Sequence, residues 1–174
     1  SHAARLLAER GIKVVGIGDH SASYYNENGI DIPAAIDYSV KNNRNLKGFK
    51  GAREIPNAEL LTSKCDILVP AALQNVITEE NAPNIQAKLI VEGANGPTMP
   101  EADEIIREKR IVCVPDILAN AGGVVVSYFE WVQGLQYYFW RESEITTRLQ
   151  EVMTRAFNRV WALATKEGTD LRTA

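Results

Sequence analysis

The side chains best suited to binding chemistry stand in short polar or glycine-rich segments, each of which follows an apolar run. Asp19 offers a carboxylate, and Asn95 and Asn120 each offer an amide that both donates and accepts hydrogen bonds. No residue is a good candidate for a general acid or base, so the pattern predicts binding and positioning. The four segments are 19–21 (Asp-His-Ser), 71–72 (Ala-Ala), 93–96 (Gly-Ala-Asn-Gly) and 119–123 (Ala-Asn-Ala-Gly-Gly).

Asp19 follows the apolar segment 12–18. In dinucleotide-binding units, an acidic residue about 20 positions after a glycine-rich turn binds the adenosine ribose hydroxyls. Asp19 has that spacing if such a turn stands just before Ser1. A carboxylate there repels a 2′-phosphate, and no Arg or Lys occurs between Asp19 and Glu27, which favours NAD over NADP. The alternative is that Asp19 only caps or turns the chain.

Ser127 lies in an otherwise apolar stretch, seven residues after Asn120. Its hydroxyl can bond back to the carbonyl four residues earlier in its own helix. It can equally donate to a substrate carboxylate, with Val124 one helical turn away shaping the pocket. The spacing alone leaves both interpretations open. No metal site is predicted, because neither histidine has a partner and Cys65 and Cys113 match no ligand spacing.

The elements that position these residues alternate between strands and helices. The sequence predicts an opening helix that ends at Gly11, a helix capped by Asp31, and a short helix that opens at Thr78. Turn chemistry is expected at 24–29, a further helix at 100–109, and strands at 12–18, 66–70, 88–92 and 111–115. This order predicts an α/β fold of Rossmann-like, doubly wound type with a mostly parallel sheet. Ligands bind such sheets at the carboxyl ends of the strands, where the four polar segments fall.

The pattern changes after Asp116. An apolar and aromatic stretch over 117–140 contains a Gly122-Gly123 pair, and apolar residues recur at helical spacing from Ile145 to Leu163. We therefore predict a dinucleotide-binding domain over residues 1–140 and a C-terminal helical segment over 141–174. Since the chain opens within a helix, the domain is expected to be truncated at its N-terminus.

Composition narrows the class of protein. The chain has 174 residues, 45% of them apolar, with 19 Lys and Arg against 22 Asp and Glu. The net charge of −3 gives no basic surface for nucleic acid or an anionic membrane. No apolar run approaches the ~18–20 residues that span a bilayer. The two cysteines are expected to be buried, reduced thiols, which predicts a cytoplasmic protein.

Three longer motifs carry a specific resemblance. They are Pro-Ala-Ala-Leu-Gln-Asn-Val-Ile-Thr-Glu-Glu-Asn-Ala (70–82), Val-Glu-Gly-Ala-Asn-Gly-Pro-Thr (91–98) and Val-Pro-Asp-Ile-Leu-Ala-Asn-Ala-Gly-Gly-Val (114–124). All three resemble the amino-acid dehydrogenases that act on glutamate, leucine, phenylalanine or valine. The continuation Ser-Tyr-Phe-Glu-Trp-Val-Gln (127–133) resembles the glutamate dehydrogenase branch. The resemblance covers essentially the whole chain in order.

The resemblance implies roles for the candidate residues. Asp19 would sit near the adenosine ribose of NAD, with NADP not excluded, while Ala71, Asn95 and Asn120 would line the nicotinamide half. Two further residues would contact the substrate. Ser127 would hydrogen-bond to a carboxylate of the bound glutamate, and Val124 would contact the side chain of that glutamate. The implied partners are L-glutamate, 2-oxoglutarate and ammonium, in a homohexamer.

The resemblance also implies what this chain lacks. The family's glycine-rich turn would end just before Ser1, and its N-terminal substrate domain carries the catalytic lysine and acidic residue. The chain is therefore expected to be inactive alone, as one part of an enzyme for reversible oxidative deamination of glutamate. Two alternatives stay open: a nonenzymatic module that senses NAD, and a leucine, phenylalanine or valine dehydrogenase.

Overall fold

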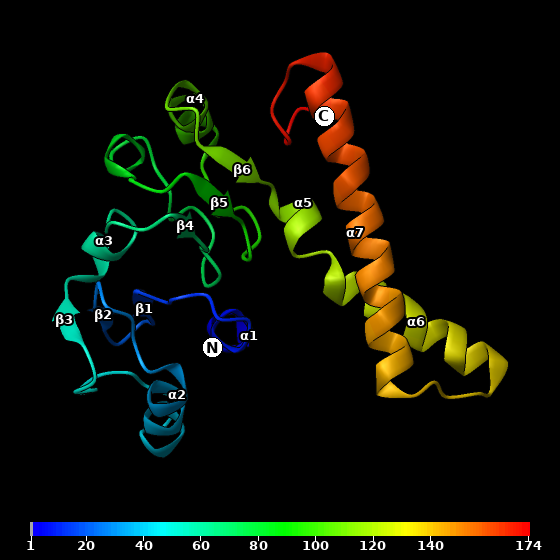
Figure 1. The fold of residues 1–174 in the computed structure, drawn as a ribbon, viewed down its shortest axis with the longest axis horizontal. Coiled ribbons are helices and arrows are strands. Elements are labelled where there is room, and N and C mark those ends of the chain that lie inside the picture. Colours follow the sequence, from blue (N-terminus) through cyan, green and yellow to red (C-terminus); the bar gives the residue numbers. More distant parts are fainter. Residues whose placement is uncertain (1) are drawn as a thin grey trace. The chain divides into compact units, whose positions relative to one another are not determined.

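The computed structural model describes residues 2–174, which form two compact units (Figure 1). Among the described residues, the first unit comprises residues 2–66 and Asn84–Gln86, and the second comprises Ile67–Pro83 and Ala87–Ala174. Each unit has its own sheet of three strands. Among the described residues, no helix combines the length and apolar character needed to cross a membrane.

The sheet of the first unit is antiparallel. Helix α1 (His2–Glu9) ends two residues before Gly11, which has the positive φ expected just after a helix. Strand β1 (Gly16–Gly18) then pairs with β2 (Ser23–Tyr25), and β2 pairs with β3 (Arg53–Ile55). The sequence predicted a turn over 24–29, which overlaps the last two residues of β2, and no strand where β3 lies. Strand β2 forms there because a tight turn after β1 reverses the chain at once and because Ser23 and Tyr24 are both buried.

The helices of the first unit cover one cluster of apolar side chains. Helix α2 (Ile32–Lys41) begins at Asp31, whose carboxylate accepts a hydrogen bond of 2.9 Å from the backbone N–H of Ala34, as the capping pattern predicted. Helix α3 (Asn57–Leu60) follows β3. The buried cluster consists of Ala22, Tyr24, Ile30, Ile32, Ala35, Leu46 and Phe49.

The sheet of the second unit is parallel. Its strands β4 (Ile67–Leu68), β5 (Leu89–Val91) and β6 (Val112–Val114) lie side by side in sequence order (Figure 1). Along the chain, helix α4 (Pro100–Glu108) connects β5 to β6. This confirms the predicted α/β class with a parallel sheet, although each strand is shorter than its apolar run. The helix predicted from Thr78 is wrong. The Asn81 side chain instead bonds to the backbone of Thr78 and Val76, and only the 3₁₀ turn η1 (Ala82–Asn84) follows.

Three helices complete the second unit. The stretch predicted over 117–140 divides into α5 (Asp116–Ala119) and α6 (Gly122–Gln136), and the periodic segment forms the long α7 (Glu142–Glu167). Helix α7 packs against both α5 and α6 (Figure 1). A small buried cluster joins β6, α5, α7 and the C-terminal turn through Val114, Leu118, Ala164 and Leu171.

Candidate functional site

The loops that follow β4 and β5 lie against each other at the carboxyl edge of the parallel sheet. The backbone N–H groups of Gly93 and Ala94 donate to the carbonyl of Pro70 at 3.0 and 2.9 Å. A Cβ atom added at Gly93 would lie 3.0 Å from the Cβ of Ala71, which is too close for an ordinary side chain. Glycine therefore lets the loop approach Ala71, one of the predicted binding residues.

The loop after β5 also meets the end of α5. The amide nitrogen of Asn120 donates to Oδ1 of Asn95 at 2.8 Å and to the carbonyl of Ala94 at 3.2 Å. Helix α5 ends at Asn120, so the helix aims this side chain at the loop. The structure thus brings together three predicted residues: Ala71, Asn95 and Asn120. The pair can offer a ligand the Nδ2 group of Asn95 and the carbonyl oxygen of Asn120.

Glu92, which directly follows β5, is hydrogen-bonded to the elements that carry the amide pair, and it was not among the residues predicted from the sequence. Its side chain is fully buried. Oε1 accepts hydrogen bonds from Oγ1 of Thr98 at 2.6 Å and from Nη2 of Arg172 at 2.7 Å. Oε2 accepts one from the backbone N–H of Asp116 at 2.9 Å. A charged residue between an apolar strand and a glycine-rich loop was the available signal, but its partners lie far away in sequence.

Asp116 links Glu92 to the loop. Its Oδ2 accepts a hydrogen bond of 2.8 Å from the backbone N–H of Gly96, and its Oδ1 accepts one of 2.7 Å from Ile117. Because Asp116 starts α5, one residue fixes both the loop that carries Asn95 and the helix that carries Asn120.

The two cysteines are free thiols, half-buried where the sequence predicted buried. Burial, followed by the negative charge of Glu92, raises the pKa of Cys113 to about 12. Burial, with the charge of Asp66, also raises the pKa of Cys65. Both thiols therefore stay protonated near neutral pH and are poor nucleophiles. Within residues 2–174, no group of His, Cys, Asp or Glu is arranged to hold a metal ion.

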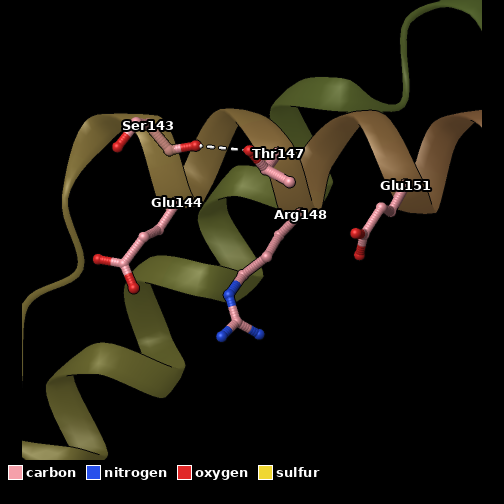
Figure 2. A pocket seen from close by; sticks show the side chains of 5 residues that line it. All are labelled: Ser143, Glu144, Thr147, Arg148 and Glu151. Atoms are coloured by element: carbon pink, nitrogen blue, oxygen red, sulfur yellow. Dashed lines mark hydrogen bonds between the residues drawn. The ribbon is translucent and has the colours of Figure 1, made fainter.

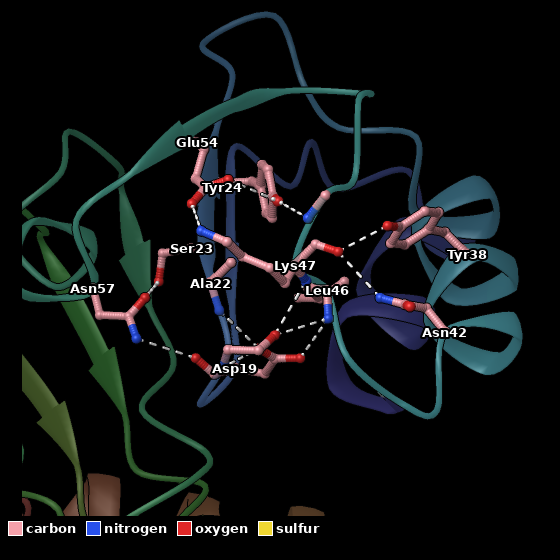
Figure 3. A network of polar contacts seen from close by, with 12 residues as sticks. Asp19, Ala22, Ser23, Tyr24, Tyr38, Asn42, Leu46, Lys47, Glu54 and Asn57 are labelled. Atoms are coloured by element: carbon pink, nitrogen blue, oxygen red, sulfur yellow. Dashed lines mark hydrogen bonds and ion pairs between the residues drawn. The ribbon is translucent and has the colours of Figure 1, made fainter.

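Asp19 belongs to the first unit, where it organises the turn after β1 (Figure 3). Its Oδ1 accepts from the hydroxyl and backbone N–H of Ser21 at 2.5 and 2.7 Å, and from the N–H of Ala22 at 3.0 Å. Oδ2 accepts from the N–H of Leu46 at 2.8 Å. Burial would raise the pKa of Asp19, but these hydrogen bonds outweigh it and lower the pKa. Asp19 therefore turns the chain, which was one of the two alternatives left open by the sequence. Binding of a ribose by Asp19 stays a prediction.

The predicted substrate residues lie on α6. The hydroxyl of Ser127 donates to the carbonyl of Gly123 at 3.0 Å, which is the bond to its own helix that the sequence left as an alternative. Val124 is 75% exposed and one helical turn away. Both side chains face outward from the second unit, and their contact with a substrate stays a prediction.

A shallow hollow at the start of α7 contains none of the predicted residues (Figure 2). Its polar groups are engaged within the helix: Glu144 accepts from the backbone N–H of Arg141 at 2.9 Å, and Thr147 donates to the carbonyl of Ser143 at 2.9 Å. Arg148 lies over the ring of Trp140. The side chains around this hollow therefore contribute to the first turns of α7, and none of the predicted binding residues is among them.

The fold and this edge together define an α/β protein whose strand-end loops converge at the carboxyl edge of a parallel sheet, the edge where such sheets generally bind ligands. A family model described as Glutamate/Leucine/Phenylalanine/Valine dehydrogenase matches residues 1–174, and the chain belongs to that family. Among curated relatives, it is 45% identical over 174 residues to a cryptic catabolic NAD-specific glutamate dehydrogenase of Bacillus subtilis. It is 50% identical over 173 residues to a glutamate dehydrogenase of Thermotoga maritima. The chain spans 40% and 41% of the length of these two relatives.

Solved structures agree with this assignment. The chain resembles the glutamate dehydrogenase of Peptoniphilus asaccharolyticus with 37% identity and a TM-score of 0.76, covering 98% of this chain and 39% of the other. It resembles the hetero-hexameric glutamate dehydrogenase of Thermus thermophilus with 30% identity and a TM-score of 0.85, at the same coverages. The family assignment made from the three motifs is therefore confirmed.

Proposed function

We propose that this chain is the dinucleotide-binding part of an NAD-dependent glutamate dehydrogenase, in which residues 1–140 form the binding domain and residues 141–174 a helical segment. The whole enzyme would catalyse the reversible oxidative deamination of L-glutamate to 2-oxoglutarate and ammonia. The observation that carries the proposal is the Asn95–Asn120 pair, in which Asn95 belongs to the loop that packs against Ala71 at the carboxyl edge of a parallel sheet. Its family context is 45–50% identity to named glutamate dehydrogenases.

The amide pair suits the nicotinamide half of the cofactor. A carboxamide and the ribose hydroxyls each need both donors and acceptors, which Asn95 and Asn120 supply. Ala71, which packs against the same loop at Gly93, is proposed to line this half of the site with its small side chain. The nicotinamide ring, when bound, would accept the hydride that leaves the α-carbon of glutamate. The task of these residues is to hold the ring at hydride distance, which is catalysis by positioning.

Asp19 is proposed to bind the adenosine ribose and to favour NAD. Its Oδ2 accepts one hydrogen bond from Leu46 and, with two lone pairs, has capacity for a ribose hydroxyl. Its pKa is lowered, so the carboxylate is charged at neutral pH and would repel a 2′-phosphate. Two Bacillus subtilis relatives are named as NAD-specific, which agrees with this preference. Binding of NADP is the competing outcome of the test.

The substrates proposed are L-glutamate or 2-oxoglutarate with ammonium, contacted by Ser127 at a carboxylate and by Val124 at the side chain. No general acid or base is assigned to this chain, so proton transfer is proposed to come from elsewhere in a longer protein. A homohexamer is proposed from the family resemblance; the Thermus relative, described as hetero-hexameric, supports the number of subunits but not their identity. The two free thiols agree with a reducing, cytoplasmic location.

The test uses the product of the complete open reading frame that contains this sequence. Initial rates of NADH and NADPH oxidation are measured with ammonium and 2-oxoglutarate, and with 4-methyl-2-oxopentanoate as the control acid. We expect turnover with 2-oxoglutarate and NADH. Preference for the control acid would instead assign a leucine-type dehydrogenase. Binding of NADH without turnover of either acid would reject the enzyme and favour a sensor module.

A further inference from the structure

Glu92 is a buried carboxylate whose two oxygens are bonded from three different parts of the second unit. Thr98 approaches from the loop after β5, Asp116 from the start of α5, and Arg172 from the C-terminal turn. A buried charge is tolerated when it is paired and hydrogen-bonded, and both conditions are met here. The side chain is 0% exposed, so water cannot replace a lost partner.

Arg172 is held in place for this contact. Its Nη2 lies 2.7 Å from Oε1 of Glu92, and its Nε lies 2.7 Å from Oδ2 of Asp103. The turn that carries it is closed by Asp170, whose Oδ1 accepts from the backbone N–H groups of Arg172 and Thr173, both at 2.9 Å. The planar guanidinium thus bridges two carboxylates through two different nitrogens, a geometry that the single nitrogen of a lysine side chain does not match.

The buried carboxylate is connected to both members of the amide pair by short chains of hydrogen bonds. Through the backbone N–H of Asp116 it fixes the start of α5, a four-residue helix that ends at Asn120. Through Thr98, and through the bond from Gly96 to Asp116, the loop that carries Asn95 is fixed at its far end. A shift of Glu92 would therefore move both asparagines.

We propose that Glu92 and Arg172 are positioning residues for the nicotinamide half of the cofactor: Arg172 neutralises Glu92, and Glu92 holds Asn95 and Asn120 at their bonding distance. The inference rests on the proposed function and extends it to the C-terminal turn. Neither Glu92 nor Arg172 is proposed to touch the cofactor. Their influence passes through the loop and helix that Glu92 joins.

The variant Arg172→Met leaves Glu92 buried without its cation. We expect the dissociation constant of NADH to rise about tenfold, the change produced when one or two hydrogen bonds to the nicotinamide half are lost. ADP-ribose, which lacks the nicotinamide, should bind as it does to the unaltered protein. Both constants are measured by titration on the complete open reading frame product, well below the melting temperature of each variant. If Arg172→Met does not fold, Arg172→Lys replaces it in the titrations. The dissociation constant of NADH should then rise by a smaller factor, again without a change for ADP-ribose.

Two further variants separate positioning from general damage. Arg107→Met removes another cation that contacts the C-terminal turn, 3.1 Å from Asp170, without touching Glu92, and should leave NADH binding unchanged. The double variant Glu92→Gln with Arg172→Met removes the unpaired charge and should recover much of the lost affinity.

Each result has a definite meaning. Selective weakening of NADH, with recovery in the double variant, supports the proposal. Unchanged NADH binding in Arg172→Met, or equal weakening of NADH and ADP-ribose, overturns it while leaving the proposed function intact. Failure of the unaltered protein to bind NADH overturns the proposed function and this inference with it.

Discussion

The polar residues that follow the strands have different kinds of hydrogen-bond partners in the two units. In the first unit, Asp19 is bonded by Ser21 and Ala22, its neighbours in the chain, and by Leu46. In the second unit, Asn95 and Asn120 lie 25 positions apart and bond to each other. The difference follows from strand direction: β1 and β2 are antiparallel, whereas β5 and β6 are parallel.

Strand direction decides what a strand-end residue is free to do. An antiparallel neighbour allows a tight turn, and the residue in that turn must satisfy the local backbone donors. Parallel neighbours need a crossover, so both strands end at the same edge and their loops converge from distant parts of the sequence. Convergent loops can present side chains to a ligand, which is why the second unit carries the amide pair.

The largest expected effect contrasts a buried carboxylate of the second unit with an exposed one of the first. Glu92→Ala removes an acceptor that three donors share and leaves Arg172 only partly paired, so the free energy of unfolding should fall by about 3–5 kcal/mol. Glu9, whose ion pair with Arg5 on α1 is exposed, is the control, and Glu9→Ala should change stability little. Urea unfolding of both variants checks this. Equal effects would mean that the Glu92 network does not stabilise the second unit.

The next effect tests the close approach of loops at the parallel edge. Gly93→Ala places a Cβ atom 3.0 Å from that of Ala71 and should destabilise by about 1–3 kcal/mol through overpacking. Gly134→Ala, within α6 where an added Cβ meets no atom within 4 Å, should instead stabilise by up to about 1 kcal/mol. Thermal unfolding of both variants gives the signs. A stabilising Gly93→Ala would show that the two loops are not tightly packed.

A smaller effect on stability accompanies a functional loss at the amide pair. Asn120→Ala deletes two hydrogen bonds and should cost about 1–2 kcal/mol of stability, while the dissociation constant of NADH rises roughly tenfold. Asn28→Ala, at an exposed position of the first unit, is the control for both quantities. Urea unfolding and NADH titration measure them. Unaltered NADH affinity in Asn120→Ala would remove the pair from the proposed site.

Much of this arrangement could be predicted from the sequence, because local patterns determine it. The capping residue Asp31 marked the start of α2, and apolar runs marked β5 and β6. Placing polar segments at the carboxyl ends of parallel strands was enough to group Ala71, Asn95 and Asn120. The strand β2 was missed because the turn residues that follow Tyr25 obscured a short strand that burial of Tyr24 stabilises.

The network under the site could not be predicted in the same way. Arg172 and Glu92 are 80 positions apart, and nothing in either local segment selects the other as a partner. Their pairing depends on how the C-terminal turn folds back after α7, which Asp170 closes. Long-range pairs of charges of this kind become visible only when tertiary structure is known.

The smallest effect tests the local role of Asp19 through pH. Its pKa is lowered in the folded protein from the ordinary value of 3.8, so the folded state binds fewer protons than the unfolded state just below that pH. The resulting stabilisation is fully present above about pH 4 and is lost as the pH falls through the lower, folded-state pKa. Asp19→Asn should therefore destabilise the protein near neutral pH, and the difference from the unaltered protein should shrink toward pH 3.

Urea unfolding at a series of pH values from 7 to 3 measures this difference, with Asp37→Asn on the exposed face of α2 as the control. A difference that stays constant across the series would mean that the turn does not depend on the charge of Asp19. The carboxylate would then be available to a ribose hydroxyl without weakening the turn. A difference that shrinks would mean that cofactor binding has to share Asp19 with its own chain, unlike the amide pair of the second unit.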